Sequence, residues 1–250
     1  MLLRLPTSVP EARECLAERA VPIGGATLVW ATWQRDGFPE LAMSLRGVPE
    51  ANVIGPQALG GAVVLHRIDT RVPDVMRLAA ATVGTGAVRR TATVGGNLAG
   101  STLRCLLPAA LVLDARATVL ESDAVRETDL AEVVAKRPVL LGLRWPAPLA
   151  SAYRKLPAPP GGAPPLVVAS ALHTEDGTGR RLRVAVRDGY DVLTGTTRYD
   201  ADALAGPGPG PDAEEALDAL RATDLGHLPG PAWDVIGPQV TGLLAGQGWG

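Results

Sequence analysis

Two short glycine-rich segments contain the residues best suited to bind an anionic ligand. Gly24-Gly25-Ala26-Thr27 (the first glycine loop) and Thr93-Val94-Gly95-Gly96-Asn97 (the second glycine loop) each combine two adjacent glycines with a hydroxyl or amide side chain. Residues without Cβ let a ligand approach the backbone, and successive N–H groups then form a concavity that binds anions. This composition suits a diphosphate and its sugar.

The same composition is also that of an ordinary tight turn, because glycine is the default turn residue. The chain contains neither GxGxxG nor GxxxxGK[ST], so the Rossmann and P-loop modes of nucleotide binding lose their main support. A nucleotide would have to be bound in another way.

Other chemistry has little support in the sequence. His66, His173 and His227 are far apart and none lies in an HExxH motif, which argues against a metal site or a catalytic triad. Cys15 and Cys105 are the only cysteines. Two thiols cannot form a four-ligand zinc or iron–sulfur site, so any such metal centre belongs to another chain.

The elements that position these residues are expected to mix helices and strands. Ser8 or Thr7 before Pro10 and Glu11 indicates a helix that runs to about Ala20. The other expected segments of the first part of the chain are strands at 21–23, 51–54, 61–65 and 117–120, helices at 73–81 and 106–114, and loop and strand at 82–100.

The last hundred residues are expected to begin with a proline- and glycine-rich connector at 147–165. Strands at 166–173 and 181–186, with Asp176-Gly177 between them, are typical of an antiparallel pair. A linker at 206–211 and a helix at 211–222 complete the expectation.

Composition sets the class of protein. The 250 residues are 46% hydrophobic and carry a formal charge of −2, so the chain can bury a core but lacks the positive field that nucleic acid requires. No signal peptide pattern and no uninterrupted apolar run of about 20 residues is present. We expect a cytoplasmic protein without nucleic-acid or membrane partners.

Three segments, in order, resemble a known family. They are VPEARECLAERAVPIGGATL, QALGGAVVLHRID and VPDVMRLAAATVGTGAVRRTATVGGNLAG, and residues 86–98 resemble the motif Q-[IV]-R-N-x-A-T-[IV]-G-G-N-[LI]. The resemblance covers about residues 5–156. It is to the FAD-binding medium subunit of molybdenum hydroxylases, as in carbon monoxide dehydrogenase and xanthine dehydrogenase, of which this chain looks like a divergent member.

The resemblance implies an α+β fold: two α/β FAD-binding subdomains at 1–55 and 56–150, then a C-terminal α+β subdomain at 151–250. It implies FAD as the cofactor and molybdopterin and 2Fe-2S subunits as partners. By the same resemblance, Tyr153 and Lys155 lie near the flavin ring, where the lysine stabilises negative charge. The implied FAD-binding residues are Gly24, Gly25, Ala26, Thr27, Arg89, Thr93, Gly95, Gly96, Asn97 and Cys105.

The chain departs from the family pattern at several of these positions. Alignment on Pro108 places Cys105, with one residue deleted, where the family has an aspartate that binds the flavin's polyol chain. A thiol is a weak acceptor in place of a charged one. Arg90 replaces the usual asparagine, Thr27 stands where aspartate or asparagine is common, and residues 157–162 replace an arginine pair and an aspartate.

Three functions therefore remain open. The chain is a divergent FAD subunit that passes electrons to or from a molybdenum and iron–sulfur partner, or a free-standing flavoprotein that oxidises or reduces a small molecule. The third is a non-redox or scaffold descendant that uses the flavin cleft for another ligand. Flavin content separates the third function from the first two.

Overall fold

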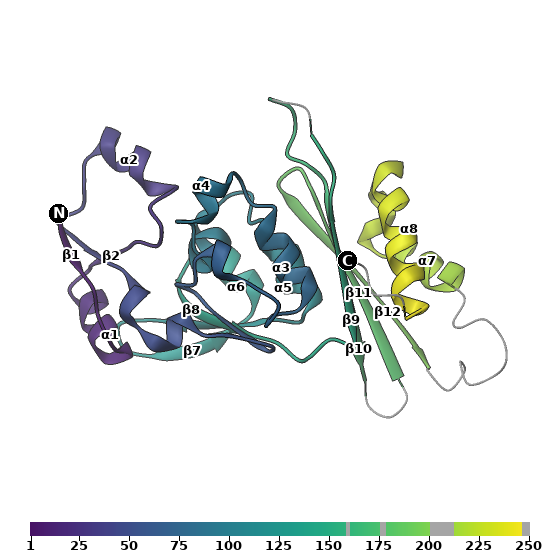
Figure 1. Ribbon diagram of the computed structural model, residues 1–250, viewed down its shortest axis with the longest axis horizontal. Helices are drawn as coiled ribbons and strands as arrows, with labels where there is room; N and C mark the ends of the chain where they lie inside the picture. Colours follow the sequence, from purple (N-terminus) through teal and green to yellow (C-terminus); the bar gives the residue numbers. More distant parts are fainter. Residues whose placement is uncertain (159–160, 176–178, 201–212, 247–250) are drawn as a thin grey trace. The chain divides into compact units, whose positions relative to one another are not determined.

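The structure is a computed structural model that describes residues 1–158, 161–175, 179–200 and 213–246. The chain divides into two compact units. Unit 1 comprises Met1–Val72, Ala80–Leu106 and Ala115–Pro146, and unit 2 comprises Pro73–Ala79, Leu107–Asp114 and Ala147–Gly250. Helices and strands mix in both units, which confirms the predicted α+β class (Figure 1). The three-subdomain boundaries stay a prediction.

The first sheet of unit 1 is parallel, and β3 (Leu41–Met43) lies between β1 (Leu2–Arg4) and β2 (Val21–Pro22). Strands β1 and β2 both pair in parallel with β3. Helix α1 (Val9–Ala17) begins as predicted, because Ser8 Oγ accepts a hydrogen bond from the Glu11 amide at 3.4 Å. Ala12 and Cys15 of this helix pack in a core that includes Met43. Helix α2 (Val29–Asp36) follows the first glycine loop.

The second sheet of unit 1 is antiparallel, in the order β4-β5-β8-β6-β7. Its strands are β4 (Ile54–Gly55), β5 (Ala58–Gly60), β6 (Arg116–Leu120), β7 (Val125–Thr128) and β8 (Val139–Arg144). The remaining helical segments of unit 1 are η1 (Leu45–Gly47), η2 (Pro49–Asn52), η3 (Leu65–Arg67), α4 (Gly86–Arg89), the π-helical η4 (Gly96–Gly100) and α6 (Leu130–Lys136). Helix α3 (Asp74–Ala81) is divided between the two units.

Two predicted strands of unit 1 are wrong. Residues 51 and 52 belong to η2, because Pro49 at its first position favours a helical turn, and only Ile54 lies in a strand, β4. Residues 61–65 form a turn with only one isolated bridge, from Val64 to Thr93. A Cβ at Gly61 would lie 2.0 Å from the Leu140 carbonyl oxygen, so backbone packing and not side-chain alternation fixes this segment.

Residues 82–100 also differ from the expected loop and strand, because two threonine hydroxyls start helical turns there. Thr85 Oγ1 accepts from the Val88 amide at 3.3 Å and begins α4. Thr93 Oγ1 accepts from the Gly96 amide at 3.2 Å, just where η4 begins. Hydroxyl side chains cap helical turns in this way even where glycines lower helix propensity.

Unit 2 is built on an antiparallel sheet in the order β12-β11-β10-β9. The strands are β9 (Ala150–Lys155), β10 (Val167–Thr174), β11 (Gly179–Asp188) and β12 (Asp191–Asp200). The predicted pairing of 166–173 with 181–186 is confirmed. The Asp176-Gly177 turn and the linker at 206–211 lie outside the described residues. The connector expected at 147–165 instead contains β9, which pairs with β10.

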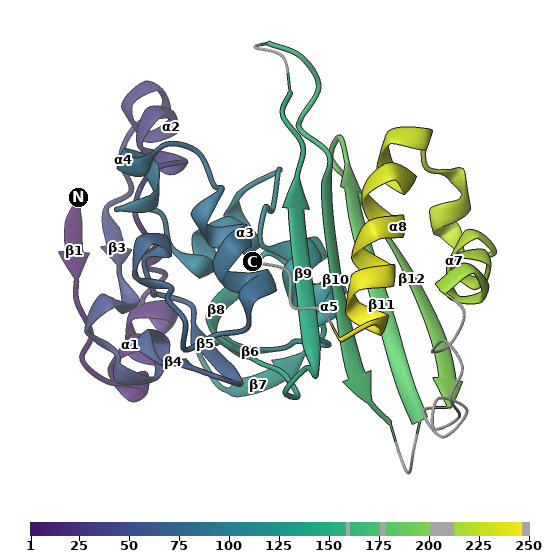
Figure 2. The same ribbon diagram turned by 45° about the vertical axis from the view of Figure 1, so that its right-hand side comes forward.

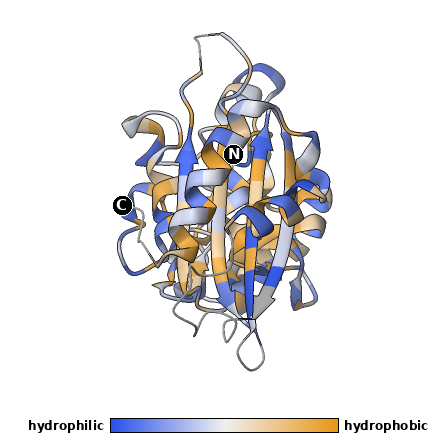
Figure 3. Cartoon of the chain, turned by 90° about the vertical axis from the view of Figure 1, so that its right-hand side faces the viewer, coloured by the Kyte–Doolittle hydropathy of each residue, from blue (hydrophilic) through white to orange (hydrophobic). Residues whose placement is uncertain are grey.

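Helices α7 (Ala213–Arg221) and α8 (Gly230–Leu244), joined by η6 (Asp224–His227), cover one face of this sheet (Figures 1 and 2). Val168, Leu182 and Val184 point to that face and pack with Leu220 and Ile236. Figure 3 shows hydrophobic residues along both the strands and these helices. The alternation of strand side chains therefore sends the neighbouring residues, Ala169 and Arg183 among them, to the opposite face.

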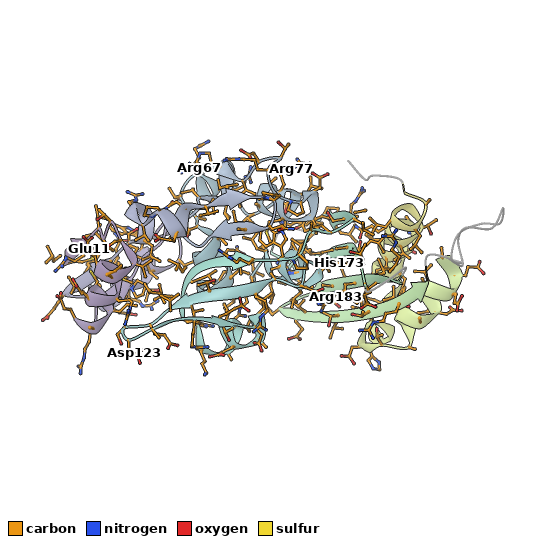
Figure 4. The ribbon with its side chains drawn as sticks, turned by 90° about the horizontal axis from the view of Figure 1, so that it is seen from below. Glu11, Arg67, Arg77, Asp123, His173 and Arg183 are labelled. Atoms are coloured by element: carbon orange, nitrogen blue, oxygen red, sulfur yellow. The ribbon has the colours of Figure 1, made fainter. Side chains whose placement is uncertain are left out.

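Helix α5 (Leu107–Val112) packs on β10 and β11 and ends at a group of charged residues. His173 is buried and its Nε2 lies 2.7 Å from the Val112 carbonyl oxygen. Asp114 follows the helix in a left-handed conformation, φ 55°, and pairs with Arg181 and Arg183 of β11. Figure 4 labels His173 and Arg183 on this sheet.

The buried histidine predicts a pH dependence of stability. Burial lowers the pKa of His173 below its ordinary 6.5; the Val112 hydrogen bond opposes this shift and the charge of Arg181 adds to it. A pKa that is lower in the folded than in the unfolded state makes the contribution fully present above about pH 6.5 and lost as the pH falls. We expect the unfolding free energy to decrease from pH 7.5 to pH 5.5 in urea titrations.

The matched variants identify the source of this slope. His173→Gln, which keeps a donor for the Val112 carbonyl, should flatten the pH dependence, whereas the same change at the exposed His227 should leave it unchanged. An unaltered slope in His173→Gln would assign the effect to other groups.

Candidate functional site

The two glycine loops lie directly against each other within unit 1. A Cβ built on Gly25 would lie 1.7 Å from the Thr91 carbonyl oxygen, and one on Gly24 would lie 2.4 Å from Thr93 Oγ1. Neither position has room for a side chain, so the first loop can approach the second only with glycine at both positions. Segments some 70 positions apart in the sequence thus form a single site.

The first loop presents unsatisfied backbone donors. Among the described residues, none accepts a hydrogen bond from the amides of Gly24, Gly25, Ala26 or Thr27. Ala26 has a φ of 58°, a left-handed conformation that is uncommon outside glycine. The loop is held at its far end by α2, since the Trp30 amide donates to the Ala26 carbonyl at 3.1 Å. Four consecutive amides are therefore available to an anion.

The second loop uses its amides to hold the fold. Val94 donates to the Val63 carbonyl at 3.0 Å and Gly95 to the Gly61 carbonyl at 2.8 Å. The Gly96 amide donates to Thr93 Oγ1 at 3.2 Å, and the Asn97 amide donates to the Thr93 carbonyl at 2.9 Å. The first loop is thus the source of backbone donors. The second loop supplies the hydroxyl proton of Thr93 and a backbone surface that a ligand can approach closely.

Asn97 connects the second loop to the segment that carries Cys105. Its Oδ1 accepts from the Leu106 amide at 2.9 Å, and the Ser101 amide donates to the Gly96 carbonyl at 3.0 Å. Asn97 is 6% exposed and Cys105 is 8% exposed, and neither described cysteine is in a disulfide. Cys105 is therefore held close to the second loop in the chain's own fold.

Arg89 has a clear structural role. Its Nη1 donates to the carbonyl oxygens of Val83 and Gly84 at 3.0 and 2.8 Å, which fixes the turn before α4. Its contact with the cofactor stays a prediction.

Tyr153 and Lys155 lie in unit 2, on edge strand β9. They pair in register with Ala169 and Val167, and they alternate with Ala152, which packs in the core under α7 and α8. Both side chains therefore belong to the opposite face of the sheet. Arg187 of β11 is in register with Val167 as well, so a second cation lies on this face.

The donor set of unit 1 fits the diphosphate of FAD. Four unpaired amides on one loop, a threonine hydroxyl and the exposed Thr27 match the acceptor-rich diphosphate. Sequence reasoning missed one polar group of unit 1: the Nε atom of Arg104 is buried without a hydrogen-bond partner among the described residues. No sequence pattern marks this arginine, because its environment is set by tertiary packing.

Cys105 provides a test of the polyol assignment. Cys105→Asp should tighten FAD binding about tenfold, because a carboxylate accepts stronger hydrogen bonds from sugar hydroxyls than a thiol does. Cys105→Ser, the matched neutral change, should alter the affinity little. Calorimetry that finds weaker binding for the aspartate variant would show that Cys105 does not face the polyol chain.

Comparisons with known proteins identify the family and the fold. The model of the FAD binding domain in molybdopterin dehydrogenase matches residues 3–141. Quinoline 2-oxidoreductase from Pseudomonas putida 86 has a similar fold, with a TM-score of 0.65 and 20% identity over 97% of this chain and 93% of that chain. Reconstituted CO dehydrogenase from Oligotropha carboxidovorans gives 0.63 and 19% over 88% and 84%.

A cyanide-inactivated Cu,Mo-CO dehydrogenase gives a TM-score of 0.64 and 19% identity over 96% of this chain and 94% of that chain. A search among curated proteins gave no match. In the described residues, no helix is long and apolar enough to cross a membrane. Because the family model spans more than half of the sequence, this chain belongs to the family of FAD-binding domains of molybdopterin dehydrogenases.

Proposed function

We propose that this chain is the flavin subunit of a molybdenum-dependent oxidoreductase and that it exchanges electrons with partner chains carrying molybdopterin and iron–sulfur clusters. Membership of the family makes it an FAD-binding oxidoreductase component. The observation that supports the site most directly is the set of four unpaired amides on the first glycine loop, next to the second loop.

Each proposed residue has a separate task. Residues 24–27 donate backbone hydrogen bonds to the diphosphate, and the Thr93 hydroxyl adds a side-chain donor. Asn97 holds the Cys105 segment next to the second loop. Gly95 and Gly96 lack side chains, so a ligand can approach the backbone of that loop. When bound, FAD supplies a centre that accepts and releases electrons.

Tyr153 and Lys155 of β9 are the residues proposed to act on the flavin ring. Tyr153 offers a face for stacking, and Lys155 stabilises negative charge. The two side chains lie two positions apart on β9 and so share one face of the sheet.

In this proposal the metal centres belong to the partner chains. Two cysteines cannot ligate an iron–sulfur cluster, and among the described residues no three metal-ligating side chains of the His, Cys, Asp and Glu types gather at one place. Two of the similar structures are CO dehydrogenases, one named for copper and molybdenum. The cytoplasmic location expected from the sequence is part of the same proposal.

Metal analysis tests the proposal. The tagged chain, purified under native conditions from the cells that encode it, should carry molybdenum and iron together with flavin. Flavin without either metal would contradict the subunit role and favour a free-standing flavoprotein. A purified chain that carries neither flavin nor metal would favour the non-redox descendant.

A further inference from the structure

Helix α5 links the candidate site to the sheet of unit 2 through the chain itself. Unit 1 continues as far as Leu106, and the six residues of α5, Leu107–Val112, belong to unit 2. The chain returns to unit 1 at Ala115. A displacement of α5 is therefore transmitted directly to the segment of unit 1 that ends at Leu106.

The start of α5 is tied to the second glycine loop. The amide of Leu106, immediately before the helix, donates to Asn97 Oδ1 at 2.9 Å. Both residues are buried, so an amide that lost this acceptor would bear the full cost of its desolvation. The arrangement of the loop and the position of Leu106 are thus energetically linked.

The end of α5 is held by the sheet of unit 2. The last carbonyls of a helix have no partner within it, and His173 Nε2 of β10 donates to the Val112 carbonyl at 2.7 Å. Two residues further on, the carboxylate of Asp114 pairs with Arg181 and Arg183 of β11. Side chains from two strands of unit 2 therefore fix this end of the helix.

Helix α5 depends on the sheet for its own structure. Isolated helices shorter than about 12–15 residues are marginal in water, and α5 has six residues. Five of these six are buried, and the helix packs on β10 and β11. Release from the sheet would therefore unfold α5 and free Leu106 from the geometry that bonds it to Asn97.

We propose that α5 is a conformational coupler. The second glycine loop keeps its ligand-binding arrangement only while α5 is seated on β10 and β11, and bound FAD in turn holds α5 on the sheet. The inference rests on the proposed flavin function. It follows from linkage, because a ligand that binds one of two states shifts the equilibrium towards that state. Each hydrogen bond and ion pair that carries the coupling lies within one unit, and the peptide chain joins them.

Hydrogen exchange in the purified full chain measures how often α5 opens. The Leu113 amide reports the end of the helix, since it donates to the Ala109 carbonyl at 3.3 Å. If FAD binds only while α5 is seated, FAD at 100 times its Kd should slow the exchange of this amide about 100-fold. In the chain without FAD, Asp114→Asn should speed this exchange, whereas Asp218→Asn on α7 should leave it unchanged.

Variants of Asn97 identify the route of the coupling. Asn97→Ala removes the acceptor of the Leu106 amide but leaves the contacts of α5 with the sheet, so FAD at 100 times the variant's own Kd should slow the Leu113 amide by less than about threefold. Asn97→Asp keeps an acceptor oxygen and should retain the slowing. Undiminished slowing in Asn97→Ala, or FAD that binds the wild-type chain without slowing this amide, would overturn the coupling. A wild-type chain that binds no FAD would instead overturn the flavin function itself.

Discussion

Gly25→Ala should lower the affinity for FAD by about 100-fold. The new methyl group would lie 1.7 Å from the Thr91 carbonyl oxygen and 2.3 Å from its carbonyl carbon, and both atoms belong to a backbone that cannot rotate away. Such overpacking costs about 1–3 kcal/mol and moves the four donor amides, and displacements near 1 Å are enough to cost about two orders of magnitude.

Two other glycines serve as graded controls in the same titration. Gly96→Ala places its Cβ 3.1 Å from Thr93 Oγ1, so a small shift of one side chain accommodates it and we expect a loss of about threefold. Gly86→Ala meets nothing closer than 3.8 Å and should bind as the wild type does. A Gly25→Ala variant with wild-type affinity would show that contact between the loops does not create the site.

Asp114→Asn should destabilise unit 2 by about 3 kcal/mol, because it removes the carboxylate shared by two partly buried arginines. Arg181 Nη2 lies 2.5 Å from Asp114 Oδ2, and Arg183 pairs with Oδ1 of the same carboxylate. Arg181 keeps Glu175 at 2.9 Å, whereas the only ion pair that Arg183 makes with a described residue is the one to Asp114. Burial already lowers the pKa of Arg183. Asparagine tolerates the left-handed backbone at this position, so the variant isolates the charge.

The matched control removes an ion pair from the surface of the same unit. Asp218 pairs with Arg221 on α7, with its side chain 75% exposed, so Asp218→Asn should change the unfolding free energy by less than about 1 kcal/mol. Urea unfolding at constant pH compares the two variants. Equal, small losses would mean that the Asp114 cluster is solvated and contributes little.

Helix starts and strand pairings could be predicted from the sequence where a few neighbouring residues determine the local structure. Ser8 and Pro10 at the start of α1, and the antiparallel pairing of β10 with β11, follow from capping and from alternation within a few residues. The glycine loops were also recognisable, because two adjacent glycines with a hydroxyl or amide neighbour point to close backbone approach.

What the sequence could not predict depends on contacts between distant segments. That Gly25 meets Thr91, and that the second loop's amides bond to Gly61 and Val63, follows only from the packed fold. In the sequence alone, the two loops look equivalent as sources of amide donors. The buried Nε of Arg104 has the same origin, since it depends on where α6 lies.

The measurement that tests the central claim most directly is a titration of the purified chain with FAD, followed by its visible spectrum after removal of unbound flavin. The account predicts saturable noncovalent binding, a retained flavin spectrum, and a marked loss of both in Gly25→Ala but not in Gly86→Ala. A colourless chain that binds no added FAD would contradict the account, because the paired glycine loops would then be turns without a flavin.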